Sequence, residues 1–329
     1  MFYLIYGEDS YRSKQKLEAI KEKYRSLCGD SNLVDINAED STFDSLVGQI
    51  STMPFLANKR LVVLRYLSKA KDDVREKLLN YLPKMPDSTV LFFYEEKADM
   101  RLTFFKTLLK NKKQCEEFKL LDEPAVKKLV QIETEKAGLK INPMALNQLI
   151  GLIGVNLWDI FNELEKIIAY KIGQKNYQKN SMWEVISQDD VLLLVSENPQ
   201  VNVFNYIDSL QGKNISCAIK DLDQLLRLGE NELRLFGLIV SQFRNLVLVK
   251  DLLQGNPAMN NFQISKLSGI NPYVVSKLAV QCRKVSFEWA KKAYGLLGEI
   301  DYQIKSGELE PKLALNLLTI RLCGNLDIE

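Results

Sequence analysis

Two short apolar runs constrain most strongly what this chain can fold into. Residues 61–64 (LVVL) and 89–93 (TVLFF) consist almost entirely of branched and aromatic residues, without polar alternation. Such runs are typical of strands that are buried on both faces, as in a parallel sheet covered by helices. Helix-like segments flank both runs, so the N-terminal region predicts an α/β fold.

Residues 1–120 continue this alternation of strands and helices. The expected strands cover 2–6, 33–36, 60–66, 89–93 and 115–118, and the expected helices cover 11–27, 42–50, 72–81 and 101–109. This order predicts a parallel sheet with helices on both faces. Glu95 and Glu96 follow the fourth strand, and we interpret them as a solvated strand end.

After Asp122 the strand-like signal disappears, and the pattern predicts helices only. They are expected at 123–137, 143–153, 157–172, 189–196, 203–210, 215–227, 231–253, 261–267, 272–282, 287–305 and 311–323. The polar stretch 173–180 is the clearest loop, and residues 197–200 are interpreted as a linker.

Bulky apolar residues stand on a turn just ahead of the run at 61–64. Pro54 stiffens this turn, and Phe55 and Leu56 follow it directly. On a rigid exposed turn such side chains fit a pocket of another protein, where each contributes about 1.5–3 kcal/mol on burial. The alternative is that both side chains pack under their own sheet as ordinary core.

The turn after the first strand is the place where a phosphate-binding loop would lie. That loop requires the pattern G-x-x-x-x-G-K-S/T, in which the second Gly leaves space for phosphate and the Lys neutralises it. Counted from Gly7, the last three positions hold Arg12, Ser13 and Lys14 instead. The pattern therefore predicts a degenerate site without ATP hydrolysis, and Lys14 is expected to be solvated rather than to bind an anion.

Residue usage excludes several kinds of site. The chain has no histidine, which removes Ser-His-Asp triads, HExxH zinc sites and a histidine general base. Its five cysteines never form a CxxC pair, so we expect no zinc site, no disulfide framework and no cofactor. No signal peptide and no apolar run of membrane length is found, which predicts a cytoplasmic protein.

Positive charge is concentrated in residues 59–113, which hold 14 Lys and Arg against 7 Asp and Glu. Such a stretch is compatible with a stand-alone nucleic-acid-binding protein, whose binding would depend steeply on salt. Solvated helix faces are the alternative explanation.

Six segments, in order along the chain, resemble the delta subunits of the bacterial DNA polymerase III clamp loader. They are YLIYGEDSY, MPFLANKRLVVLR, EEKADMRLTFFKTLLKN, LWDIFNELEKIIAY, VFNYIDSLQGKNISCAIKDLDQLLRLGE and DYQIKSGELEPKLALNLLTIRLC. The resemblance implies an AAA+-like clamp-binding domain without a working P-loop at 1–138. A small all-α lid at 139–199 and an all-α collar at 200–329, which assembles the pentamer, would follow it.

The same resemblance implies a function without catalysis. Met53, Pro54, Phe55 and Leu56 match the hydrophobic wedge that this family inserts into the beta sliding clamp, although Pro-Phe-Leu replaces the common Ser-Leu-Phe. The wedge opens the ring for loading onto primed DNA during chromosome replication. The related delta-prime subunit usually carries a zinc-binding cysteine cluster, which this chain lacks.

Partners and further contacts are also implied by the resemblance. The ATPase (gamma/tau) and delta-prime subunits would be partners, in a DNA-directed DNA polymerase (nucleotidyltransferase) holoenzyme at the bacterial nucleoid. Tyr302 resembles the position of an aromatic residue at the primer–template junction, and Tyr273 is a weaker candidate. A buried structural role is open for Tyr302 and favoured for Tyr273.

The collar is expected to contact neighbouring subunits through an apolar helix stripe. Its members are Phe236, Ile239, Val240, Phe243 and Val247. We favour the competing interpretation, in which this stripe forms the core of its own domain, because most such stripes do.

Overall fold

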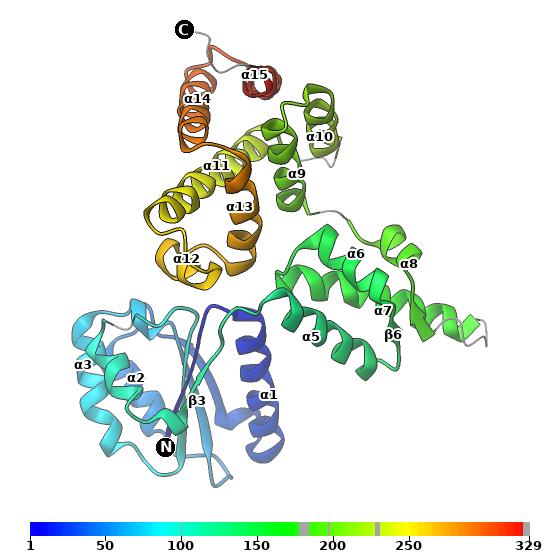
Figure 1. The fold of residues 1–329 in the computed structure, drawn as a ribbon. Coiled ribbons are helices and arrows are strands. Elements are labelled where there is room, and N and C mark those ends of the chain that lie inside the picture. The colour runs from blue at the N-terminus through cyan, green and yellow to red at the C-terminus, as the bar shows by residue number, and fades with distance from the viewer. Residues whose placement is uncertain (100, 178–183, 197, 228–230, 325–329) are drawn as a thin grey trace. The chain divides into compact units, whose positions relative to one another are not determined.

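The computed structural model describes residues 1–99, 101–177, 184–196, 198–227 and 231–324 (Figure 1). The chain divides into two compact units, Met1–Leu121 and Asp122–Glu329. A search of the described ranges finds no helix with the length and apolar character needed to span a membrane.

The first unit contains a five-stranded sheet. Its strands are β1 (Phe2–Tyr6), β2 (Leu33–Asn37), β3 (Arg60–Arg65), β4 (Thr89–Glu95) and β5 (Cys115–Glu117). They lie in the order β2-β3-β4-β1-β5, and every neighbouring pair is parallel. The predicted parallel sheet is therefore confirmed, and the two apolar runs form its adjacent central strands β3 and β4.

Helices cover both faces of this sheet (Figure 1). Side chains of α2 (Phe43–Ser51), α3 (Asp72–Tyr81) and α4 (Thr103–Leu108) pack against one face, and α1 (Ser10–Cys28) packs against the other. Alternation along β1 shows the two faces, since Leu4 belongs to the first cluster and Ile5 to the second.

The second unit is mostly helical, as predicted. Its helices are α5 (Glu123–Lys136), α6 (Pro143–Ile153), α7 (Leu157–Tyr177), α8 (Gln188–Leu194), α9 (Pro199–Gln211), α10 (Ile215–Arg227), α11 (Glu232–Gly255), α12 (Asn261–Ser268), α13 (Pro272–Lys284), α14 (Phe287–Lys305) and α15 (Pro311–Cys323). The described part of this unit also contains a short parallel pair of strands, β6 (Lys140–Ile141) and β7 (Val185–Ile186). These strands of two residues are too short to leave a sequence pattern.

Two connections differ from expectation. Helix α7 continues through the first part of the loop expected at 173–180, and residues 178–180 lie outside the described ranges. Helix α9 begins at Pro199, inside the segment interpreted as a linker. Proline is tolerated there because the first helical residues need no amide donor.

The division between the two units falls after Leu121. Helix α5, which the sequence placed in a first domain of residues 1–138, packs against α6, α7 and β6 and so belongs to the second unit. The further division into a lid at 139–199 and a collar at 200–329 stays a prediction.

The apolar stripe of α11 lies in the core of its own unit. Phe236, Ile239 and Phe243 are buried there, with Val240 and Val247 packed partly buried against the same cluster. The favoured interpretation, that these five side chains form the core of their own domain, is therefore confirmed.

Glu95 corrects another expectation, because it is buried at the end of β4 with only 1% of its surface exposed. Its two carboxylate oxygens accept hydrogen bonds from Ser68, one from the backbone N–H (2.8 Å) and one from Oγ (2.6 Å). Ser68 lies in a 3-10 turn, η2 (Leu67–Lys69), after the neighbouring strand β3. Desolvation by burial raises the pKa of Glu95 despite these bonds.

Replacing Phe243 by Ala should destabilise the second unit by about 3–5 kcal/mol, because a fully buried aromatic ring is removed from a packed core. The matched variant Leu248→Ala, on an exposed position of the same helix, should cost less than about 1 kcal/mol. Urea unfolding of the full chain measures both. Similar costs for the two variants would show that the stripe is not core.

Glu95→Gln should change how stability depends on pH. Because the folded-state pKa of Glu95 is raised, the wild-type chain loses stability relative to the Gln variant as pH rises from the ordinary range of a glutamic acid through that raised pKa. Free energies of unfolding of both proteins between about pH 4 and pH 8 test this. Parallel stability curves would contradict it.

Candidate functional site

The turn between α2 and β3 lies at the amino edge of the sheet. Because all five strands are parallel, the segments that precede strands share this edge and the segments that follow them share the opposite one. Residues 53–56, which we call the apolar turn, precede β3. Gly7 follows β1 and therefore lies at the carboxyl edge.

Three side chains of the apolar turn point into solvent. Met53, Phe55 and Leu56 are 83%, 65% and 92% exposed, and Pro54 is partly buried. The alternative that Phe55 and Leu56 form part of their own core is therefore wrong. Contiguous large apolar side chains on a surface mark interaction sites more often than single ones do.

A buried asparagine holds the backbone of this turn. Asn32 is 2% exposed, and its Oδ1 accepts a hydrogen bond from the Phe55 N–H (2.6 Å) while its Nδ2 donates to the Phe55 carbonyl (2.8 Å). The same Nδ2 donates to the carbonyl of Cys28 at the end of α1 (2.6 Å). Sequence reasoning missed Asn32, since Gly29 and Asp30 beside it indicate only a local turn.

Further bonds fix the segments on either side of the apolar turn. Thr89 Oγ1 donates to the carbonyl of Ile50 in α2 (2.8 Å), and Lys59 Nζ donates to the carbonyl of Asp87 (2.7 Å). Leu56 itself has φ +50°, a left-handed conformation that is unfavourable for a bulky residue other than glycine. Such a conformation persists only where the surrounding bonds impose it.

At the opposite edge, the loop in the position of a phosphate cradle is bonded to the chain itself. The Gly7 N–H donates to the Glu95 carbonyl (3.1 Å), and the Asp9 N–H donates to the Phe118 carbonyl (3.0 Å). Gly7 has φ +138°, and a Cβ added there would lie 2.1 Å from the Phe118 oxygen. A side chain at this position is therefore excluded, and these two amides are already satisfied.

The side chains at the altered positions of this loop also have protein partners. Arg12 Nε lies 2.6 Å from the Asp9 carboxylate, and its guanidinium donates to the Lys119 carbonyl. Ser13 Oγ lies 3.1 Å from the hydroxyl of Tyr94, whose pKa burial raises to about 12. Lys14, expected to be solvated, lies 3.2 Å from the half-exposed Glu96 carboxylate.

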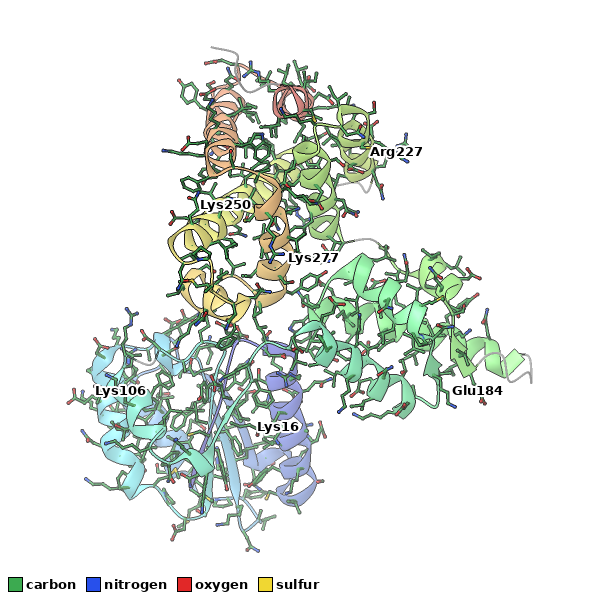
Figure 2. The ribbon with its side chains drawn as sticks, in the orientation of Figure 1. Lys16, Lys106, Glu184, Arg227, Lys250 and Lys277 are labelled. Atoms are coloured by element: carbon green, nitrogen blue, oxygen red, sulfur yellow. The ribbon has the colours of Figure 1, made fainter. Side chains whose placement is uncertain are left out.

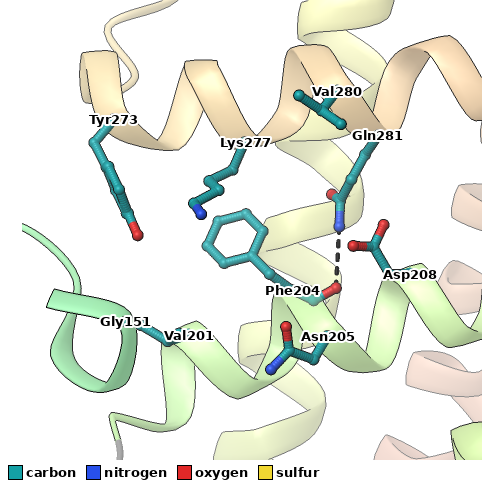
Figure 3. A pocket seen from close by; sticks show the side chains of 9 residues that line it. All are labelled: Gly151, Val201, Phe204, Asn205, Asp208, Tyr273, Lys277, Val280 and Gln281. Carbon is teal, nitrogen blue, oxygen red and sulfur yellow. Dashed lines mark hydrogen bonds between the residues drawn. The ribbon is translucent and has the colours of Figure 1, made fainter. Parts of the chain in front are cut away.

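The two tyrosines lie on different helices. Tyr302 is 68% exposed on α14, so the buried alternative for this residue is wrong. Tyr273, at the start of α13, is partly buried, with Lys277 Nζ 5.5 Å from its ring centroid. It lines a cavity of about 300 Å³ between α9 and α13 (Figure 3).

The basic stretch 59–113 is partly neutralised by carboxylates. Arg65 contacts Asp35 (2.7 Å), and Lys69 contacts Glu39 (3.3 Å). Lys106 extends into solvent from α4 (Figure 2). Because Asp35 and Glu39 lie outside residues 59–113, they offset part of the net positive charge counted for this stretch.

Among the residues that the structure describes, no group of three or more His, Cys, Asp or Glu side chains could hold a metal ion.

Comparisons with known proteins agree over most of the chain. Residues 3–118 match the family described as "DNA polymerase III, delta subunit", and residues 200–322 match "DNA polymerase III delta subunit, C-terminal domain". DNA polymerase III subunit delta of Bacillus subtilis is 25% identical, with 97% of this chain and 92% of the relative covered. A probable subunit delta of Aquifex aeolicus is 26% identical over 78% of this chain and 73% of the relative.

The fold is similar to a solved structure as well. The B. subtilis DNA clamp loader delta protein superposes with a TM-score of 0.75 at 24% identity, covering 98% of this chain and 95% of that one. The two family matches together span more than two thirds of the sequence. The chain therefore belongs to the DNA polymerase III delta subunits.

Proposed function

We propose that this chain binds the beta sliding clamp through the apolar turn and opens the ring for loading onto primed DNA. One observation carries the proposal: in a delta subunit, Met53, Phe55 and Leu56 are exposed on a turn whose backbone is hydrogen-bonded to a buried asparagine. Large apolar side chains on a fixed backbone are suited to fill a pocket of a partner.

The energy available from this contact shifts a ring toward its open state without chemistry. Burying Phe55 and Leu56 contributes about 3–6 kcal/mol together. If both side chains are buried only against the open ring, the ratio of open to closed rings rises by about 10²–10⁴-fold. The chain then acts as a ligand that binds one conformation of the clamp better than the other.

ATP hydrolysis in this proposal is left to the gamma/tau subunits, which with delta-prime complete the loader. The loop after β1 supports this assignment, because the phosphate-binding residues are replaced and the Gly7 and Asp9 amides donate to carbonyls of the chain. The chain itself has no catalytic role, and the second unit supplies the collar.

Replacing Phe55 and Leu56 by Ala should weaken binding to the clamp of the same organism by at least about a hundredfold, because two anchors are removed at once. Surface plasmon resonance with the isolated chain measures this. The matched control is Leu192→Ala/Leu193→Ala, which removes two exposed leucines from α8.

The proposal predicts normal binding for the α8 control and unchanged unfolding curves for both double variants. Equal affinity of the wild type and the Phe55→Ala/Leu56→Ala variant would place the clamp contact elsewhere. A loss of affinity in both double variants would show that general surface hydrophobicity, rather than the apolar turn, drives binding.

We also propose that Tyr302 contacts the primer–template junction in the assembled loader. Its ring is exposed on α14, and stacking on a base contributes about 1–3 kcal/mol. Tyr273 is the weaker candidate for such a contact, because its ring is partly buried and lines a pocket beside Lys277.

Tyr302→Ala should weaken primer–template binding of the assembled loader by about tenfold, and Tyr302→Phe should retain it, because the ring rather than the hydroxyl stacks. Fluorescence anisotropy with labelled primed DNA measures the affinities. The matched control is Tyr294→Ala, two turns earlier on the same helix and less exposed. Equal losses for the Tyr302→Ala and Tyr294→Ala variants would contradict a specific contact.

A further inference from the structure

The apolar turn lacks the packing that normally fixes a loop. Met53, Phe55 and Leu56 direct their side chains into solvent, and Leu56 has a left-handed backbone. Packing of these side chains therefore does not hold the turn in place. A turn with this geometry would sample many conformations unless its backbone were held from outside.

The structure shows one side chain that bonds both the backbone donor and the backbone acceptor of a single residue in this turn, Phe55. Asn32 Oδ1 accepts from the Phe55 N–H at 2.6 Å, and Asn32 Nδ2 donates to the Phe55 carbonyl at 2.8 Å. This is the pairing that a neighbouring strand would provide, made here by a side-chain amide.

Asn32 is itself fixed to a large element. Its backbone N–H donates to the Gly29 carbonyl (3.1 Å), and its Nδ2 also donates to the Cys28 carbonyl at the end of α1 (2.6 Å). Helix α1 packs its buried Leu17 against the sheet. The Phe55 backbone is thereby joined to a rigid helix on the opposite face of the sheet from α2.

We propose that Asn32 is a positioning residue that pre-organises the apolar turn for the sliding clamp. This inference rests on the proposed function of the turn. Asn32 is buried and does not meet the clamp in this account. It acts by holding Phe55 and Leu56 in the presented conformation, so that less conformational freedom is lost when the clamp binds.

The chemistry of the contact determines which substitutions are informative. Asn32→Ala removes the acceptor and both donated bonds. Asn32→Asp keeps the shape and the acceptor for the Phe55 N–H, but replaces the donor by an oxygen that faces the carbonyls of Phe55 and Cys28. Both variants should therefore release the turn.

The expected result for each variant is a loss of clamp affinity of about tenfold with the fold retained. Surface plasmon resonance on the full chain measures affinity, and urea unfolding measures stability. The matched control is Tyr94→Phe, which removes a buried hydrogen bond to Ser13 at the other edge of the same sheet. It should lower stability and leave clamp affinity unchanged.

Hydrogen exchange supplies a readout that a purely structural role would not change. In the wild-type chain the Phe55 amide should exchange slowly although its side chain is exposed, because Oδ1 of a buried residue accepts from it. In the Asn32→Ala variant, exchange across residues 52–58 should speed up selectively. The wild-type measurement remains decisive even if the variants do not fold.

The outcomes separate this inference from the function on which it rests. If Phe55→Ala/Leu56→Ala abolishes clamp binding but both Asn32 variants bind within twofold of wild type, Asn32 does not position the turn. Fast exchange of the wild-type Phe55 amide overturns the inference as well. If Phe55→Ala/Leu56→Ala binds normally, the proposed function of the turn fails first.

Discussion

Burial of a parallel sheet on both faces is the constraint on which the first unit depends. The middle of β3 (residues 61–64) and of β4 (residues 90–93) is apolar because α1 covers one face and α2, α3 and α4 cover the other. Parallel strands also give the sheet two different edges. The apolar turn lies at the amino edge and the loop after β1 at the carboxyl edge, so the proposed clamp contact and the degenerate loop are separated by the length of the strands.

The two edges are stabilised in opposite ways. At the carboxyl edge, the backbone amides of Gly7 and Asp9 donate hydrogen bonds to the carbonyls of Glu95 and Phe118. These amides therefore stabilise the fold and are not available to a ligand. At the amino edge, Asn32 satisfies the backbone of the turn while its apolar side chains stay in solvent. At this edge the backbone polar groups of Phe55 are hydrogen-bonded, while the large apolar side chains are not buried against the rest of the chain. Such an arrangement is suited to binding another protein.

Much of the fold could be predicted because apolar patterns depend on local sequence. The runs at 61–64 and 89–93 indicated the central strands, and helical periodicity gave most helices to within a few residues. The exposure of Phe55 was one of two alternatives that the sequence left open, but the bonds that hold its backbone could not be predicted, nor could the burial of Glu95. These bonds involve partners 23 and 27 residues away, Asn32 and Ser68, which only the folded sheet brings into contact. For Phe236 and Phe243 the sequence could not distinguish burial in the core of their own domain from burial against a neighbouring subunit, since both kinds of apolar stripe have the same helical spacing.

Hydrogen exchange of the wild-type chain with and without the sliding clamp tests the central claim most directly. Binding through the apolar turn predicts slower exchange across residues 52–58 at saturating clamp, with exchange across residues 7–14 unchanged. Protection at another surface, with residues 52–58 exchanging as in the free chain, would contradict the account.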